Sequence, residues 1–128
     1  MKSRLRNLTI EGQAYVYWYT TGHRFTLNLS PKDNKNIKIT LIFQADPPDE
    51  DPYTFWAFYD ITAVKDGLQT TIHLGKPKHI AQILSYLRKE RSIWFTPGQG
   101  RPHVVEHAWD LLQEMGYSRL KPVWVGEW

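Results

Sequence analysis

The sequence predicts an α+β fold in which an antiparallel sheet of about five strands, connected as a meander, is followed by two amphipathic helices packed on one face. Apolar and polar residues alternate through much of the first 75 residues, and after Gly75 the apolar residues recur at helical spacing. Most connections between the expected strands are short, which favours antiparallel pairing. We expect a single domain, with the sheet in residues 1–75, two helices in residues 76–117, and a C-terminal arm or edge strand in residues 118–128.

The clearest strand signals lie in the first third of the chain. Residues 8–20 are rich in aromatic and β-branched side chains, and Glu11-Gly12 is expected to interrupt them as a bulge or a hairpin turn. Residues 25–29 and 37–44 alternate apolar and polar side chains with a period of two. Such alternation is typical of strands with one buried face, so we expect strands in all three segments.

A hairpin is expected from residues 54–64 and 68–74, because Asp66-Gly67 between them favours the positive φ angles of a tight turn. Residues 45–52 hold three prolines and four carboxylates. Proline cannot donate to a sheet, so we expect this acidic segment to be a solvated loop.

Two helices are expected in the second half. Pro77 and Pro102 each suit the first turn of a helix, and Gly116 suits the left-handed residue that ends one. Each helix carries an apolar stripe, formed by Ile80, Ile83, Leu84 and Leu87 in the first and by Val105, Ala108, Trp109, Leu112 and Met115 in the second.

Composition excludes several classes of site. The chain has no cysteine, so a disulfide, a thiolate metal site and a cysteine nucleophile are all ruled out. The net charge of +3 arises after residue 64, in the half that carries the helices. This excess is modest for a polyanion-binding protein. The chain lacks a long apolar run, so we expect a cytoplasmic protein that is neither secreted nor membrane-spanning.

Three short stretches resemble a group of short bacterial proteins that have strands followed by two helices. The resemblance implies a bacterial origin and one domain, and it transfers neither an activity nor any catalytic or binding residue. The stretches are Thr9-Ile10-Glu11-Gly12 leading into Tyr15-Val16-Tyr17, Gly75-Lys76-Pro77-Lys78-His79-Ile80, and Leu112-Gln113-Glu114-Met115-Gly116-Tyr117.

One segment matches a metal-site pattern. His103-Val104-Val105-Glu106-His107 spells H-x-x-E-H, which resembles the zinc motif of inverted zinc peptidases. On a helix, His103 and His107 would reach one metal ion while Glu106 polarises a bound water. A third ligand from downstream would have to be Glu114 or Glu127. We favour the alternative that these residues form the solvated face of an amphipathic helix, and we expect no cofactor.

The aromatic content suggests a binding surface. The chain has six Trp, seven Tyr and five Phe. Tyr15, Tyr17 and Tyr19 are expected on one strand face, and Trp56 and Phe58 on one face of another strand. Either set could fill the core or form an exposed platform, because two helices leave one sheet face partly uncovered.

We therefore expect a small non-enzymatic protein that recognises another protein through the aromatic sheet face or the acidic loop, with self-association as a further possibility. No G-x-S-x-G elbow supports a nucleophilic enzyme. The first alternative is nucleic-acid binding, in which tyrosines stack on bases and helix cations contact phosphates. The second alternative is a zinc-dependent hydrolase. The helix cations of the nucleic-acid alternative are Lys76, Lys78, Arg88, Lys89 and Arg91.

Overall fold

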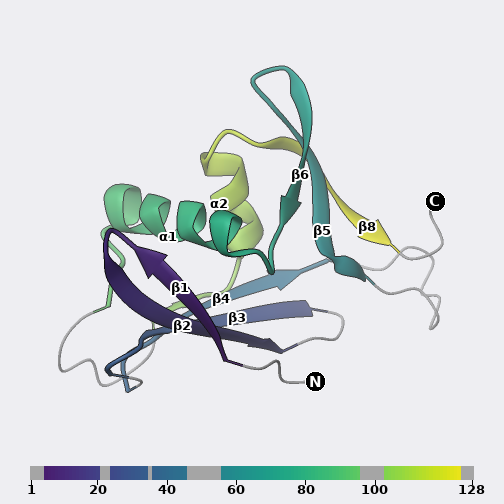
Figure 1. Ribbon diagram of the computed structural model, residues 1–128. Helices are drawn as coiled ribbons and strands as arrows, with labels where there is room; N and C mark the ends of the chain where they lie inside the picture. The colour runs from purple at the N-terminus through teal and green to yellow at the C-terminus, as the bar shows by residue number, and fades with distance from the viewer. Residues whose placement is uncertain (1–4, 21–23, 35, 46–55, 96–102, 125–128) are drawn as a thin grey trace.

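The computed structural model describes residues 5–20, 24–34, 36–45, 56–95 and 103–124, which form the expected α+β fold (Figure 1). The elements in chain order are β1 (Arg6–Ile10), β2 (Gln13–Thr20), β3 (Arg24–Pro31), β4 (Ile39–Gln44), β5 (Trp56–Lys65), β6 (Leu68–His73), α1 (Pro77–Arg91), β7 (His103–Val105), α2 (Ala108–Glu114) and β8 (Ser118–Trp124). No helix in these ranges is long and apolar enough to cross a membrane.

The larger sheet has five strands in the order β1-β2-β3-β4-β7. Its first four strands form the expected antiparallel meander, and β7 joins β4 in parallel. Glu11-Gly12 is a hairpin turn rather than a bulge, because Ile10 pairs directly with Gln13 and both turn residues have positive φ. The alternation in β4 is confirmed, since Ile39, Leu41 and Phe43 are all fully buried.

The second helix was expected to include residues 103–107, and this expectation is wrong. Residues 103–105 form strand β7, and α2 begins only at Ala108. Two adjacent valines favour extended backbone, and β4 offers its free edge to them. In the strand, Val105 is buried opposite Leu41. The free energy gained by this burial exceeds the preference for a helix that the spacing of the apolar residues gives. Pro102 lies outside the described residues.

A second sheet holds three strands in the order β6-β5-β8, and it stands beside the first sheet (Figure 1). The expected hairpin at Asp66-Gly67 is confirmed, since both residues have positive φ and Lys65 pairs with Leu68. Residues 118–124 form an edge strand against β5, which decides between the two alternatives for this part of the C-terminal segment. The acidic loop, residues 45–52, lies outside the described residues beyond Ala45.

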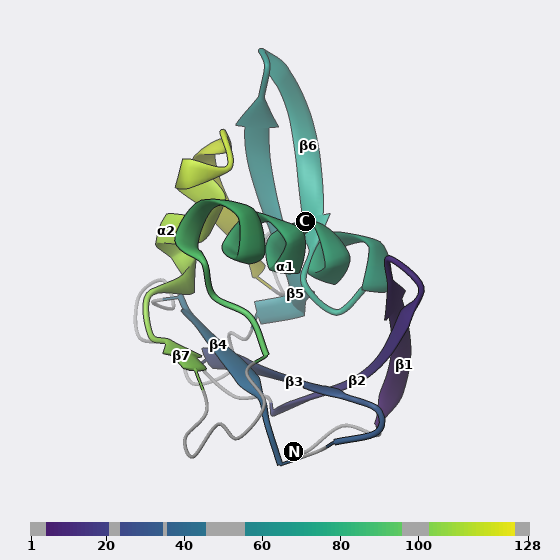
Figure 2. The ribbon, with the colours of Figure 1, turned by 90° about the vertical axis from the view of Figure 1, so that its left-hand side faces the viewer.

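Both helices lie on the same face of the five-stranded sheet (Figures 1 and 2). The apolar face of α1 packs there with the inward side chains of β3 and β4, and Ile61, Ile72 and Leu74 extend the same core into the second sheet. The four residues of the stripe expected on α1 are all buried, namely Ile80, Ile83, Leu84 and Leu87.

An irregularity in β5 separates two aromatic residues that were expected on one face. Phe58 and Tyr59 have φ angles of 50° and 56°, and the pairing of β5 with β8 shifts register between Trp56 and Ile61. Such a bulge reverses the direction of the side chains that follow it. Trp56 is therefore buried, whereas Phe58 is 81% exposed.

Replacing Gly12 by alanine tests the left-handed turn between β1 and β2. The φ of Gly12 is +81° and its surroundings are open, so a new methyl group meets backbone strain alone. We expect Gly12→Ala to lower the free energy of unfolding by about 1 kcal/mol in urea denaturation. Gly75→Ala is the control, because a Cβ there lies 4.0 Å from the Tyr19 ring, an ordinary contact. Equal losses in both variants would contradict this account.

Candidate functional site

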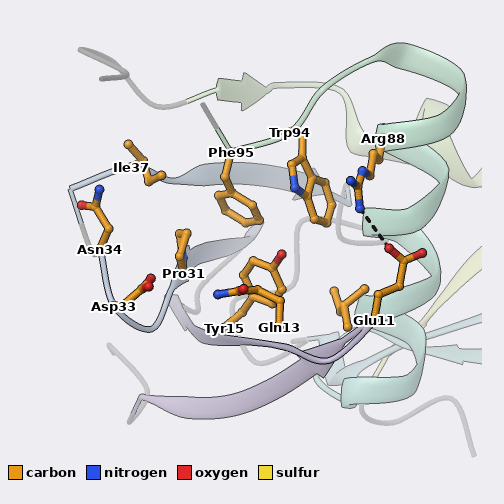
Figure 3. Close-up of a pocket in the computed structure, with 11 residues that line it drawn as sticks. Glu11, Gln13, Tyr15, Pro31, Asp33, Asn34, Ile37, Arg88, Trp94 and Phe95 are labelled. Atoms are coloured by element: carbon orange, nitrogen blue, oxygen red, sulfur yellow. Dashed lines mark hydrogen bonds and ion pairs between the residues drawn. The ribbon is translucent and has the colours of Figure 1, made fainter. Parts of the chain in front are cut away.

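An open pocket of about 550 Å³ lies between two turns and the end of α1 (Figure 3). The β1–β2 turn forms one side, the turn between β3 and β4 forms another, and the chain that follows α1 forms the roof. The residues that line it are Ile10, Glu11, Gln13, Tyr15, Pro31, Asp33, Asn34, Ile37, Arg88, Trp94 and Phe95.

Three aromatic rings form the centre of this pocket, and we call Tyr15, Trp94 and Phe95 the aromatic triad. The Tyr15 and Phe95 rings are stacked with centroids 5.1 Å apart. The Trp94 ring meets Tyr15 edge-on at 5.8 Å and Phe95 edge-on at 5.1 Å. These mutual contacts hold the rings in fixed orientations, so a ligand meets a preformed apolar wall.

The end of α1 explains how Trp94 and Phe95 reach the pocket. Ser92 adopts a left-handed conformation with φ of 54°, and its N–H donates to the carbonyl of Leu87. The N–H of Ile93 donates to the same carbonyl at 3.1 Å. This left-handed cap stops the helix and reverses the chain, so the two aromatic residues return over β2.

An ion pair closes one end of the pocket. Arg88 donates from a guanidinium nitrogen to a Glu11 carboxylate oxygen at 3.0 Å, and it connects α1 to the β1–β2 turn (Figure 3). The guanidinium also lies 4.6 Å from the centroid of the Trp94 ring, in cation–π contact. Both charged groups are largely exposed, so the pair contributes little to stability and remains accessible to a ligand.

The Tyr15 hydroxyl is the titratable group inside the aromatic triad. Burial raises the pKa of Tyr15 above its usual 10.0, Arg88 opposes this, and Glu11 and Asp33 add to it. The hydroxyl is therefore protonated at neutral pH and available as a hydrogen-bond donor. With the side-chain amides of Gln13 and Asn34, it places neutral polar groups among apolar walls.

These residues equip the pocket for stacking, hydrogen bonding and ion pairing. Among the described residues that line the cavity (Figure 3) there is no histidine, serine, threonine or lysine. These described side chains therefore do not combine a hydroxyl nucleophile with an adjacent base. The pocket is suited to holding a ligand, and nothing in its lining assigns it a reaction.

Of the two roles left open for the tyrosines of β2, the structure shows that they point into the core. Tyr15 is 5% exposed and Tyr17 is 1% exposed, and Tyr19 packs against the same core. The Tyr17 hydroxyl donates to the carbonyl of Gly75 at 3.4 Å. Trp56 is buried too and stacks on Trp109 with centroids 5.6 Å apart. These aromatic residues fill the core, which was the first of the two alternatives, and they do not form an exposed platform.

The opposite face of the five-stranded sheet carries a different aromatic residue. Cross-strand pairing puts Trp18, Asn28, Thr40 and Val104 in one row across four strands. The Thr40 hydroxyl donates to the Asn28 side-chain oxygen at 2.9 Å, and the Lys38 ammonium lies 5.6 Å from the Trp18 ring centroid. This face is therefore mixed in polarity, with a single half-buried tryptophan in that row.

The five helix cations do not share one surface. Lys76 and Lys78 lie at the start of the 15-residue helix α1, whereas the three others lie in its last turn. Arg91 pairs with Glu114 of α2. Arg88 and Lys89 both border a hollow beside Trp94, so these two cations alone accompany an aromatic residue of the pocket.

The H-x-x-E-H segment lacks the helical geometry that the metal hypothesis requires. His103 lies on β7, and His107 is the residue before α2. The two imidazoles therefore do not lie one turn apart on a helix face. Within the described ranges, no group of three or more histidine, aspartate or glutamate residues is placed to hold a metal ion.

Another histidine cluster lies at the opposite end of α1 from the pocket. His73 Nδ1 and a carboxylate oxygen of Asp60 are 2.7 Å apart, across the β5–β6 ladder. The His79 ring meets the His73 ring edge-on at 5.5 Å. Burial lowers the pKa of His79, and nearby His73 and Lys78 lower it further. The contacts of this cluster connect the β5–β6 hairpin to the start of α1.

Sequence reasoning missed Trp94 and Phe95, because it gave no role to the segment between the two expected helices. The available signal was the apolar run Ile93-Trp94-Phe95 directly after a helix. A linker with three consecutive large apolar residues is expected to be covered by the protein. That run predicts burial, but it does not predict that the chain reverses onto Tyr15.

Comparisons with known proteins give no relative for this chain: no family model, curated protein or solved structure matches it.

The electrostatics of the pocket predict how Tyr15 titrates. Arg88 lowers the Tyr15 pKa, and Glu11 raises it. We therefore expect Arg88→Ala to raise this pKa further and Glu11→Gln to lower it, measured by NMR of the labelled tyrosine ring. Because the folded-state pKa is raised, the stability linked to Tyr15 is present below pH 10 and is lost as the pH rises through the folded-state pKa. Shifts in the reverse directions would contradict this arrangement.

Proposed function

We propose that this protein is a non-enzymatic binding protein, and that the pocket receives an apolar or aromatic side chain from an extended segment of a partner protein. The observation that carries the proposal is the aromatic triad at the centre of an open cavity of about 550 Å³. This volume falls within the roughly 300–1,000 Å³ typical of ligand pockets. The cytoplasmic location expected from the cysteine-free sequence is part of the same proposal.

The preformed geometry supports binding. Tyr15 and Phe95 stack on one another, and Trp94 meets both edge-on. These three side chains therefore lose little conformational entropy when a ligand binds. Aromatic residues are enriched among the residues that dominate binding energy at protein interfaces. A partner side chain that covers the exposed edge of Trp94 gains apolar contact without rearrangement of the core.

The polar rim supports a peptide as the ligand. Gln13 and Asn34 carry amide groups that both donate and accept hydrogen bonds, as a peptide backbone requires. Asp33 lies at one end of the pocket and the Glu11–Arg88 pair at the other (Figure 3). An apolar centre with a polar rim is the usual composition of a protein-binding site.

Selection from a displayed library of random peptides tests the proposal. We expect recovered peptides to contain an aromatic or large aliphatic anchor, and Trp94→Ala to weaken their binding by about tenfold or more, as loss of a central aromatic contact does. Binding is measured by fluorescence polarisation. The matched control is Trp18→Ala, because Trp18 is also half-buried beside a cation but lies on the opposite sheet face.

The outcomes separate the candidate surfaces. Loss of binding in Trp18→Ala alone would place recognition on the opposite sheet face and contradict the pocket. Failure to recover any peptide would contradict peptide recognition.

Labelled single-stranded RNA tests the nucleic-acid alternative, since Arg88 and Lys89 lie beside Trp94. RNA binding at physiological salt that Lys89→Glu abolishes and Lys78→Glu does not would favour that alternative.

A further inference from the structure

Strand β6 has an outer edge that no other strand of the described chain covers. It pairs with β5 on one side only, because the sheet order is β6-β5-β8. Figure 2 shows the outer part of the β5–β6 hairpin extending beyond the helices, with no described element beside β6 on the side away from β5. An edge strand of this kind presents unpaired backbone N–H and C=O groups to solvent.

The register of the hairpin identifies which groups face outward. Lys65 and Leu68 flank the two-residue turn as a hydrogen-bonded pair, and the N–H of Leu74 donates to the carbonyl of Tyr59. Even-numbered residues of β6 therefore bond to β5. By alternation, the backbone groups of Gln69, Thr71 and His73 point away from β5.

Among the strands that the structure describes, the other sheet edges have features that hinder pairing, and β6 does not. The edge strand β8 contains Pro122, carries Arg119 and Lys121, and pairs irregularly with β5. Strand β7 has three residues, and β1 carries an arginine at its start. Proline, cationic side chains and short length are the usual means of preventing edge pairing. Strand β6, with the sequence LQTTIH, has none of these features.

We propose that β6 pairs antiparallel with β6 of a second copy of this chain, with the twofold axis at Thr71. In this register Thr71 faces Thr71 of the other copy, and Gln69 faces His73. All three outward-facing residues then lie in hydrogen-bonded pairs, and roughly four new backbone hydrogen bonds form, because the carbonyl of His73 already accepts from the N–H of Lys76 at 3.1 Å. The two three-stranded sheets become one continuous sheet.

Two side chains gain partners in this register. Leu68 is 72% exposed and points to the same side of β6 as Ile72 and Leu74. Centring on Thr71 puts Leu68 opposite Leu74 of the second copy, whose own side chain is fully buried, so Leu68 lies over the end of that apolar core. The same register brings Asp66, at the tip of one hairpin, towards Lys76 at the start of α1 in the other copy, and both side chains are exposed.

Engineered cysteines test the register, because the chain has no cysteine of its own. Facing residues in a hydrogen-bonded antiparallel pair lie about 5.5 Å apart between Cα atoms, a separation that a disulfide spans. We expect Thr71→Cys to form a cross-linked dimer under mild oxidation. Gln69→Cys is the matched control on the same strand, because the two copies of residue 69 lie about 14 Å apart.

Sedimentation of the unmodified protein and of charge variants completes the test. We expect a concentration-dependent dimer, a dissociation constant about tenfold higher for Asp66→Lys, and recovery when Lys76→Asp is added to that variant. A protein that remains monomeric at high concentration would overturn the proposal. Cross-linking of Gln69→Cys that equals or exceeds that of Thr71→Cys would also overturn it, since another contact would then be responsible.

Discussion

The structure depends above all on the burial of one face of the central strands β3 and β4 beneath α1. Phe25, Leu27, Leu41 and Phe43 are all fully buried on this face. Strand β2 pairs with β3 in a register that puts its tyrosines on the same side, so those tyrosines become core residues. This one constraint removes the exposed tyrosine platform and leaves Tyr15 at the border of the core, where the aromatic triad forms.

Local patterns in the sequence were sufficient for the elements that depend on neighbouring residues. Alternation in β4, the Asp66-Gly67 turn and the apolar stripe of α1 each predict the observed element. Contacts between distant segments could not be predicted in this way. The helical spacing that starts at Val105 was overridden by parallel pairing with β4, and the bulge at Phe58 depends on how β8 packs against β5.

The candidate site also depends on contacts between distant segments, which local sequence patterns do not predict. The sequence left Tyr15 as a candidate for either the core or an exposed binding face, and it contributes to the pocket from a nearly buried position. Its partners Trp94 and Phe95 arrive because Ser92 reverses the chain after α1, and no residue type in that segment requires a left-handed conformation. The nucleic-acid alternative assigned Arg88 a phosphate contact, and the structure shows this side chain paired with Glu11 and in contact with the Trp94 ring.

The pocket borders the end of α1 at Arg88, whereas β6 directly precedes the start of α1, so a dimer formed through β6 leaves both pockets accessible. The most direct measurement of the central claim is a set of intermolecular NOEs between this protein and a peptide recovered by selection. Our account predicts NOEs from the anchor side chain of the peptide to the rings of Tyr15, Trp94 and Phe95. NOEs to Trp18, with none to these three rings, would contradict it.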